Sequence, residues 1–276
     1  MSYFTEDTSE EQVLARLAPD VDPRFREVIG SAVHHLHAFV KEVEPTMAEW
    51  EQAIGFLTAT GQICDDKRQE WILASDTLGV SMLVDAINHR RPGGATENTV
   101  LGPFHVSGAP ERENGASICL DGKGKPCIVR GRVLDEDGNP IPGAKIDVWQ
   151  TNDDGFYDVQ QPGEQPDMNM RGLFTAQADG SYEFVTVKPL PYSIPTDGPV
   201  GLLLNAMGRH AMRPAHIHYI VQAPGYETLV THIFPEGDPY LDSDAVFGVK
   251  ESLIVPFDDT GDTTRADFEV RLKKLA

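Results

Sequence analysis

The sequence predicts a mainly β protein, an antiparallel β-sandwich preceded by an α-helical N-terminal region. Up to about residue 90, apolar residues recur at the three- and four-residue spacing of a helix face. From about residue 128, short segments alternate with a period of two and are separated by turns rich in glycine and proline. The stretch between them is rich in Gly, Pro, Thr and Glu, which is typical of a crossing segment. We therefore place the helical region and its linker at residues 1–112 and the sandwich at residues 113–276.

Three helices are expected in the N-terminal region. Asp22-Pro23 supplies a cap and a first-turn proline, and the apolar stripe of the first helix then runs from Phe25 to Val43. Thr46 and Glu49 have the spacing of a capping box, which predicts the start of a second helix. Residues 67–88 carry a further apolar stripe and predict one continuous third helix.

Seven or eight short strands are expected in the second region. Turn sequences such as Asp179-Gly180 separate them, a pattern that indicates an antiparallel sandwich. The predicted strands are residues 128–134, 144–150, 172–176, 181–187, 216–223, 227–234, 252–255 and 268–272.

Composition excludes several classes of protein. A formal charge of −20 excludes nucleic acid as a partner, because the chain has no means of neutralising a phosphate backbone. No apolar run approaches the length of a membrane span, so we expect no membrane insertion. The N-terminus lacks the layout of a signal peptide, and the three cysteines form no Cys-x-x-Cys pair. These features predict a reduced, cytoplasmic protein.

The most informative motif is the segment Arg213-Pro214-Ala215-His216-Ile217-His218. Residues i and i+2 of a strand point to the same face, so His216 and His218 are expected to present both imidazoles to one point. Neutral imidazole is the commonest side-chain metal ligand. An ordinary pair of polar strand residues is the competing interpretation.

Two tyrosines on loops are candidate partners for these histidines. Tyr157 ends a turn that leaves a predicted strand, and Tyr192 lies in the proline-stiffened loop 191–199. Two phenolates and two imidazoles suit Fe(III), because the phenolates nearly offset its charge. Zinc fits less well, since its catalytic sites usually take a third His, Cys or carboxylate. Packing at the rim of the sheet is the alternative role for each tyrosine.

Several segments resemble the intradiol ring-cleavage dioxygenases, which split an aromatic 1,2-diol between its hydroxyls with non-haem Fe(III) and O2. The resembling segments are residues 99–104, 143–150, 208–210, 213–218 and 237–240. The resemblance implies one Fe(III) per subunit and places its ligands on Tyr157, Tyr192, His216 and His218.

Within this family the chain is most similar to the branch that acts on hydroxyquinol (benzene-1,2,4-triol). Asp76 lies in a helix segment that covers the pocket in that branch, where its carboxylate could accept a hydrogen bond from the third ring hydroxyl. A solvated helix acid is the alternative for Asp76. His232 and the segment 241–248 are further markers of this branch. The resemblance places the substrate pocket on Leu73, Asp76, Val100, Leu101, Gly102, Pro103, Phe104, Ile194, Pro195, Arg213 and Val246.

The resemblance also assigns catalytic roles. The tyrosine corresponding to Tyr192 leaves the metal when the diol binds and helps to accept a proton. Arg213 is the candidate for stabilising negative charge on the ring during oxygen attack. A salt bridge to a nearby carboxylate is the competing role for Arg213 in so acidic a chain. The expected product from hydroxyquinol is 3-hydroxy-cis,cis-muconate (maleylacetate), a step of aromatic catabolism.

Partners follow from the same resemblance. The helical region forms a homodimer in that family, and a phospholipid commonly lies in a tunnel at the interface. The apolar stripe from Phe25 to Val43 is compatible with both, and equally with an internal core. Two other functions stay open: a catechol or chlorocatechol 1,2-dioxygenase with the same iron chemistry, and a non-catalytic β-sandwich binding module.

Overall fold

The structure is a computed structural model that describes residues 3–65, 68–90 and 94–275. The chain divides into two compact units, Met1–Ala59 and Thr60–Ala276. The first contains α1 (Ser9–Leu14), α2 (Pro23–Val43) and most of α3 (Met47–Gln62). No helix in these described ranges is both long and apolar enough to span a membrane.

The N-terminal helices begin where the cap residues predict. Asp22 Oδ1 accepts a hydrogen bond from the Phe25 amide at 2.8 Å, and Pro23 occupies the first turn of α2. Thr46 and Glu49 form the reciprocal bonds of a capping box, with Thr46 N donating to Glu49 Oε2 at 2.8 Å. The short helix α1 was not expected from the sequence.

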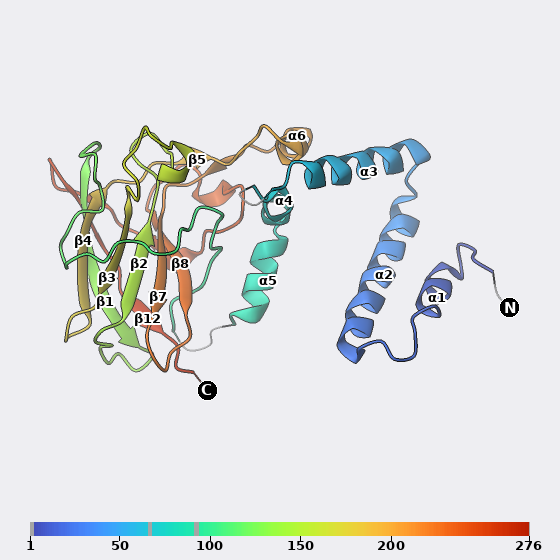
Figure 1. Cartoon of the computed structure of the whole chain (residues 1–276), viewed down its shortest axis with the longest axis horizontal. Helices are drawn as coiled ribbons and strands as arrows, with labels where there is room; N and C mark the ends of the chain where they lie inside the picture. Colours follow the sequence, from blue (N-terminus) through green and yellow to red (C-terminus); the bar gives the residue numbers. More distant parts are fainter. Residues whose placement is uncertain (1–2, 66–67, 91–93, 276) are drawn as a thin grey trace. The chain divides into compact units, whose positions relative to one another are not determined.

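The second unit is a β-sandwich with helices α4, α5 and α6 beside it (Figure 1). One sheet has the order β10-β11-β1-β12, with β4 also paired to β1; the other has the order β3-β2-β7-β8-β9. A two-stranded ribbon, β5-β6, stands apart from both. The strands are β1 (Pro126–Asp135), β2 (Lys145–Trp149), β3 (Arg171–Thr175), β4 (Ser181–Val187), β5 (Tyr192–Ser193), β6 (Met212–Arg213), β7 (Ile217–Gln222), β8 (Leu229–Pro235), β9 (Ile254–Val255), β10 (Asp258–Asp259), β11 (Thr264–Asp267) and β12 (Val270–Leu272).

The sandwich is confirmed, and its pairing is mixed. Antiparallel pairs join β1 to β4 and β2 to both β3 and β7, whereas β1 pairs in parallel with β11 and β12 and β8 pairs in parallel with β9. The core lies between the sheets. Burial alternates along β4, whereas β7 and β8 are buried on both faces. Members of the core include Val129, Ile146, Phe174, Phe184, Ile217, Tyr219, Ile233 and Val270.

The prediction of one continuous third helix was wrong. The segment forms two helices, α4 (Glu70–Thr77) and α5 (Val80–Asn88), because Gly79 adopts a left-handed φ of +75° between them. The predicted start at Lys67 lies outside the described residues. A further helix, α6 (Pro199–Ala206), was missed, although Pro199 occupies a typical first-turn position.

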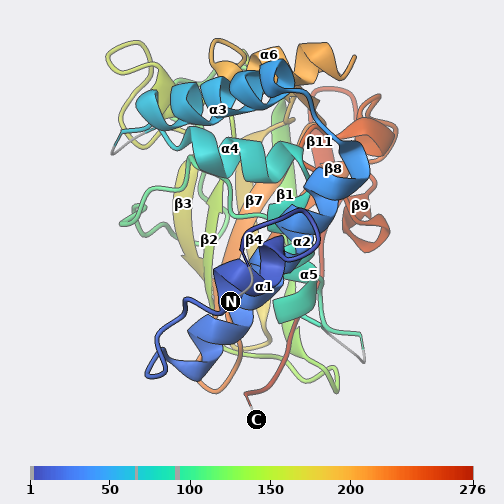
Figure 2. The ribbon, with the colours of Figure 1, turned by 90° about the vertical axis from the view of Figure 1, so that its right-hand side faces the viewer.

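The helices α4 and α5 lie beside the second sheet, on the side away from the first sheet (Figures 1 and 2). The linker reaches the same side. Thr99 N donates to Val230 O at 3.0 Å, and Thr231 Oγ1 donates to Glu97 O at 2.8 Å, so the linker runs along β8. The outer face of the second sheet is therefore covered by chain and can hold a buried site.

Gly131 in β1 allows a test of the close packing between β1 and the Phe268 backbone in the first sheet. A Cβ at this position would overlap the Phe268 carbonyl, which the Tyr182 hydroxyl also contacts at 2.7 Å. We expect Gly131→Ala to lower the free energy of unfolding by about 3 kcal/mol, because backbone must move to admit the methyl group. Chemical denaturation measures this loss.

Gly61→Ala is the matched control, since a Cβ there meets only Trp71 Nε1 at 3.6 Å. Its helical position predicts a free energy of unfolding that is unchanged or raised by up to about 1 kcal/mol. Equal losses in the two variants would contradict the assigned role of Gly131.

Candidate metal centre

A row of aromatic side chains crosses three strands on the outer face of the second sheet. The register pairs Trp149 of β2 with His218 of β7, and His218 with His232 of β8. Trp149 stacks on His218 with ring centroids 4.5 Å apart and planes 10° apart. The edge of His232 meets the other side, with centroids 4.1 Å apart. The orientation of the His218 ring is therefore set by its two neighbours in the sheet.

Four side chains bring atoms with lone pairs together beside this row, and we call these atoms the donors because each could bind a metal ion. Tyr157 OH lies 2.8 Å from His218 Nε2 and 3.2 Å from Tyr192 OH. His216 Nε2 lies 3.2 Å from His218 Nε2 and 3.5 Å from Tyr192 OH. All four residues are buried. The structure thus brings together all four residues that were predicted as metal ligands.

Separate elements position the four residues. His218 lies in β7 and His216 directly precedes that strand, as the i, i+2 pattern predicted. Tyr192 lies in β5, and Tyr157 precedes the 3-10 helix η1 (Asp158–Gln160). His216 Nδ1 lies 2.7 Å from Pro214 O, so this nitrogen donates and leaves Nε2 free to act as a ligand.

The donor set fits a metal ion. Nitrogen and oxygen ligands held about 2.0–2.2 Å from one ion lie about 3.3–3.6 Å apart when the arrangement is tetrahedral. The four contacts just described, at 2.8–3.5 Å, are close to this spacing. Burial lowers the pKa of His216 to about 3 and that of His218 well below its ordinary value, with Arg213 adding to both effects. Both rings are therefore neutral and can bind a cation through a lone pair.

Burial shifts the pKa of the Tyr157 phenol upward, opposite to its effect on the two histidines. Burial, followed by the charge of Tyr192, raises the pKa of Tyr157 well above its ordinary value. Without a cation this hydroxyl keeps its proton, so binding of a metal through Tyr157 must release that proton.

His232 is a third buried histidine at the site. Its ligand atoms lie within 4.8 Å of those of His216 and His218. Its ring stacks on that of His216 with centroids 4.8 Å apart, and burial followed by His216 lowers its pKa well below the ordinary value. Its ring contacts the rings of both His216 and His218, so we assign it to packing behind these two histidines.

Arg213 faces the donor cluster and is paired with a carboxylate. Its Nη1 lies 3.3 Å from His216 Nε2, while Nε and Nη2 donate to Asp244 Oδ1 and Oδ2 at 3.1 and 3.4 Å. Burial alone would lower the pKa of Arg213, but Asp244 and Tyr192 outweigh burial and the pKa is raised. The salt bridge considered from the sequence therefore exists, and it fixes a permanent positive charge beside the donors.

Asp244 was not proposed from the sequence. Burial opposes its ionisation, but Arg213 outweighs burial and the pKa of Asp244 is lowered. Its oxygens also accept from the amides of Val246 at 3.2 Å and Gly248 at 2.9 Å. One carboxylate thus joins Arg213 to the loop that carries Val246.

The linker covers the donors. A Cβ on Gly102 would lie 3.3 Å from His218 Cε1, so this glycine lets the backbone approach the ligand closely. Phe104 stacks on Tyr157 with centroids 4.6 Å apart. His105 packs on Trp149 and its Nε2 lies 3.1 Å from Asp147 Oδ2. These contacts exclude water from one side of the cluster.

The residues proposed for the substrate pocket surround this cover. A cavity of about 220 Å³ is lined by Leu73, Asp76, Pro103, Phe104 and Pro195, among others. A second cavity shares Asp76 and Pro103 and adds Val100, Leu101 and Gly102. Ile194 and Val246 pack in one apolar cluster with Leu73 and Val100.

Asp76 is a buried acid, which excludes the interpretation of a solvated helix residue. It is 7% exposed, and burial raises the pKa of its carboxyl despite a hydrogen bond from Ser81 and the charge of Arg213. A buried carboxyl at a cavity wall is a candidate for contact with a polar ligand group.

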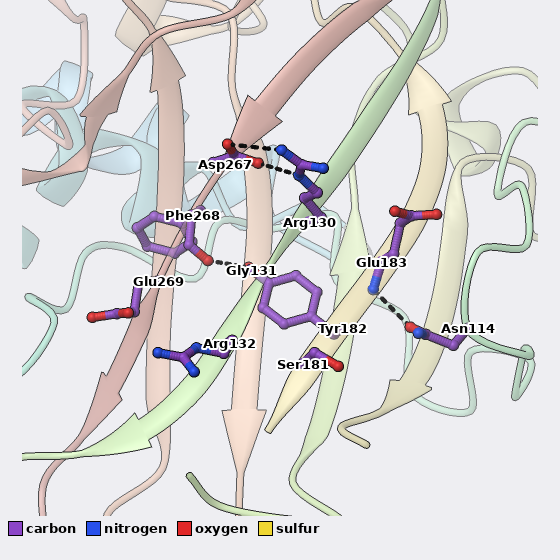
Figure 3. A pocket seen from close by; sticks show the side chains of 10 residues that line it. All are labelled: Asn114, Arg130, Gly131, Arg132, Ser181, Tyr182, Glu183, Asp267, Phe268 and Glu269. Carbon is purple, nitrogen blue, oxygen red and sulfur yellow. Dashed lines mark hydrogen bonds and ion pairs between the residues drawn. The ribbon is translucent and has the colours of Figure 1, made fainter. Parts of the chain in front are cut away.

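Another hollow lies on the first sheet, apart from the proposed ligands. It is lined by strand residues that include Arg130, Tyr182 and Asp267, and an ion pair joins Arg130 to Asp267 with Nε and Oδ1 2.6 Å apart (Figure 3). None of the residues proposed as ligands or pocket residues lines it.

Two phenols and two imidazoles thus form a buried cluster on a β-sandwich, next to a fixed cation, and this set of side chains suits a metal ion. Two family models match the chain: "Catechol dioxygenase N terminus" over residues 22–96 and "Dioxygenase" over residues 100–273. The chain therefore belongs to the intradiol ring-cleavage dioxygenase family.

Individual relatives match nearly the whole chain. A hydroxyquinol 1,2-dioxygenase of Rhizobium sp. strain MTP-10005 is 62% identical over 264 residues, which cover 96% of this chain and 90% of that protein. The crystal structure of hydroxyquinol 1,2-dioxygenase from Pseudomonas putida DLL-E4 is 50% identical, with a TM-score of 0.93, and the match covers 98% of this chain and 99% of that one. Catechol 1,2-dioxygenase of Acinetobacter radioresistens is 29% identical, with a TM-score of 0.86, covering 100% and 95%.

The Asp244–Arg213 pair provides a test of the site. We expect Asp244→Asn to lower kcat/KM by up to about a hundredfold, because Arg213 loses the partner that orients it. The free energy of unfolding should also fall by about 3 kcal/mol, since a buried charge is left unpaired. Steady-state O2 uptake and chemical denaturation measure the two effects.

Asp242→Asn is the control, because Asp242 is an exposed acid two residues away. Asp242→Asn should leave kcat/KM unchanged and the free energy of unfolding within about 0.5 kcal/mol of that of the starting protein. Full activity in Asp244→Asn would show that Arg213 needs no partner.

Proposed function

We propose that this protein is a hydroxyquinol 1,2-dioxygenase, which consumes benzene-1,2,4-triol and O2 and yields 3-hydroxy-cis,cis-muconate (maleylacetate). Ring cleavage inserts both atoms of O2, so the product keeps every carbon and hydrogen of the triol and gains two oxygens. The observation that carries the choice of substrate is the buried carboxyl of Asp76 at the wall of the pocket. The 62% identity to a hydroxyquinol 1,2-dioxygenase supports the same choice.

We infer that Tyr157, Tyr192, His216 and His218 hold one Fe(III) per subunit. Two anionic phenolates nearly offset a trivalent charge and disfavour reduction, whereas two neutral imidazoles complete the donor set. When bound, the ion would supply a Lewis acid that acidifies the diol hydroxyls and the redox chemistry needed for reaction with O2.

Tyr192 is the donor best placed to leave the centre. It is 9% exposed, while Tyr157, His216 and His218 are between 1% and 3% exposed. It also lies in a two-residue strand rather than in one of the large sheets. We assign Tyr192 the role of accepting a proton from the incoming diol, a role that its phenolate oxygen can fill.

Arg213 acts on the reacting ring through its charge. Asp244 occupies Nε and Nη2, so the Nη1 end is directed at the donors. A cation fixed before the reaction stabilises negative charge that develops on the ring without reorganisation of solvent.

Asp76 recognises the third hydroxyl of the triol by accepting a hydrogen bond from it. Burial deprives its carboxyl of solvent, and a hydroxyl that donates to it would recover part of the lost solvation. Catechol lacks this hydroxyl and would leave Asp76 with its hydrogen bond from Ser81 but with no partner on the ring. The catechol and chlorocatechol alternatives lack a role for a buried acid at this position.

A homodimer formed through the N-terminal helices, with a phospholipid at the interface, extends the proposal. Large apolar side chains on α2 support it: Phe25, Leu36 and Phe39 are each more than half exposed in the single chain. Several large apolar side chains exposed on one helix are typical of an interaction site. A cytoplasmic location stays a prediction from the sequence.

Iron content provides the first test. Protein purified in air should hold about one iron per subunit and absorb visible light through tyrosinate-to-Fe(III) charge transfer. Tyr157→Phe should lose most of this absorption because it removes a phenolate donor, whereas Tyr226→Phe, a half-buried tyrosine outside the site, should keep it. Elemental analysis that finds zinc in place of iron would overturn the assignment.

Substrate preference provides the second test. O2 uptake with benzene-1,2,4-triol should exceed that with catechol, and Asp76→Asn should lower kcat/KM for the triol at least about tenfold more than for catechol. Catechol is the internal control, because a general loss of folded enzyme lowers both. Equal losses would remove the role of Asp76, and a starting protein that prefers catechol would replace the proposed substrate.

A further inference from the structure

The residue pair Gly208-Arg209 ends α6 in a way that directs the arginine across the molecule. Gly208 has a φ of +66°, its amide donates to Asn205 O at 3.0 Å, and the Arg209 amide donates to Leu204 O at 2.9 Å. These are the two bonds of a Schellman motif, in which glycine supplies the left-handed residue. Arg209 therefore leaves the helix in a fixed direction.

The guanidinium of Arg209 joins two segments that are far apart in the sequence. Nη1 donates to Thr77 O at 2.5 Å and Nη2 donates to Ala245 O at 3.0 Å. The same group lies over the ring of Phe247, 4.8 Å from its centroid. We call these four residues, Arg209, Thr77, Ala245 and Phe247, the Arg209 clamp.

Each clamped carbonyl lies next to a residue of the proposed site. Thr77 is the last residue of α4, whose terminal carbonyls lack partners within the helix, and it follows Asp76. Ala245 follows Asp244, the partner of Arg213, and precedes Val246. The Arg209 side chain thus holds the end of α4, which carries Asp76, against the loop that carries Asp244. Asp244 in turn orients Arg213.

The other end of α4 is fixed by α6 as well. Glu70 is buried, and its Oε1 accepts a hydrogen bond from the Val200 amide in the first turn of α6 at 3.1 Å. Since α6 holds α4 at its start and Arg209 holds it at its end, loss of the clamp releases only the end that carries Asp76.

The conformation of Phe247 indicates a specific function for the clamp. Phe247 has a φ of +58°, a left-handed conformation that costs free energy for an aromatic residue, and it is half exposed. Its ring contacts the Gly79 turn, where an added Cβ would lie 3.5 Å from it. An exposed aromatic held in a strained backbone is unexpected unless its ring has a partner, and here Arg209 and the Gly79 turn supply the contacts.

We propose that Arg209 is a specificity-determining positioning residue, which holds Asp76 at the distance from Arg213 that accepts the third hydroxyl of the substrate. It lines neither of the two cavities beside Asp76. The part of this inference that concerns the triol rests on the proposed function, whereas the mechanical part, the fixing of α4 against the Ala245 loop, does not.

The experiment compares Arg209→Met, which keeps the apolar stem of the side chain but loses both hydrogen bonds and the charge over Phe247, with the starting protein. We expect kcat/KM for benzene-1,2,4-triol to fall about tenfold and kcat/KM for catechol to fall less than about threefold. In an Asp76→Asn background Arg209→Met should cause no further loss of discrimination, because residues that act through one another are not additive.

Hydrogen exchange tests the clamp without any substrate. The amides of Leu78 and Gly79 donate to Ala74 O and Asp76 O in the last turn of α4. In Arg209→Met their exchange should accelerate at least about tenfold. The control is Arg130→Met, which breaks an ion pair with Asp267 on the first sheet and should leave both exchange and discrimination unchanged (Figure 3).

The outcomes distinguish the mechanical part of the proposal, the fixing of α4, from its role in substrate discrimination. Unchanged exchange in α4 would overturn the clamp, and equal losses on both substrates would overturn its role in specificity. If the starting protein prefers catechol, the proposed function fails, yet accelerated exchange confined to α4 would still support the clamp.

Discussion

The register of three neighbouring strands is the constraint on which the site depends. Trp149, His218 and His232 lie opposite one another on β2, β7 and β8, so their side chains emerge on the same face. A slip of one residue would turn His218 into the core and Tyr219 out of it. The apolar inner face, with Ile217, Tyr219 and Ile233, therefore fixes the register that also delivers the ligands. The same strand register is therefore needed to pack the core and to place the proposed ligands.

Burial gives the site its chemistry as well as its geometry. The same loss of solvent lowers the pKa values of His216 and His218 and raises that of Tyr157. The imidazoles are thereby ready to bind a cation, whereas the phenol releases its proton only when a cation replaces it. A strong Lewis acid displaces such a proton more readily than a weak one, which agrees with the Fe(III) proposed for this site. Arg213 adds a fixed charge that would repel a cation, and Asp244 offsets it.

The sequence predicted the parts of this site that obey local rules. The i, i+2 spacing of His216 and His218 depends only on the geometry of a strand. Outside the site, the turn at Asp179-Gly180 depends likewise only on turn chemistry. The loop positions of Tyr157 and Tyr192 made them candidate partners of the histidines, but their assignment as ligands came from resemblance to a family. Contacts across 24 to 61 residues of chain leave no local pattern.

Three features of the structure were not predicted. Asp244 is one acid among many in a chain of charge −20, and only its burial against Arg213 distinguishes it. The break between α4 and α5 was hidden because the apolar stripe continues across Gly79, although that glycine was a usable signal. The parallel pairs of β1 depend on long-range pairing with β11 and β12, which periodicity does not report.

The division between shared chemistry and substrate choice follows the layers of the second unit. The proposed metal ligands and their packing partners belong to the second sheet, the β5-β6 ribbon and the Tyr157 turn, which are fixed by backbone pairing and by the core. Asp76 instead lies on a short helix held at both ends by side-chain contacts, those of Glu70 and Arg209. Side-chain contacts can change without disturbing a sheet, so α4 can be repositioned while the ligands stay in place. A family built in this way can alter which ring it accepts at α4 and keep one mode of oxygen chemistry at the sheet.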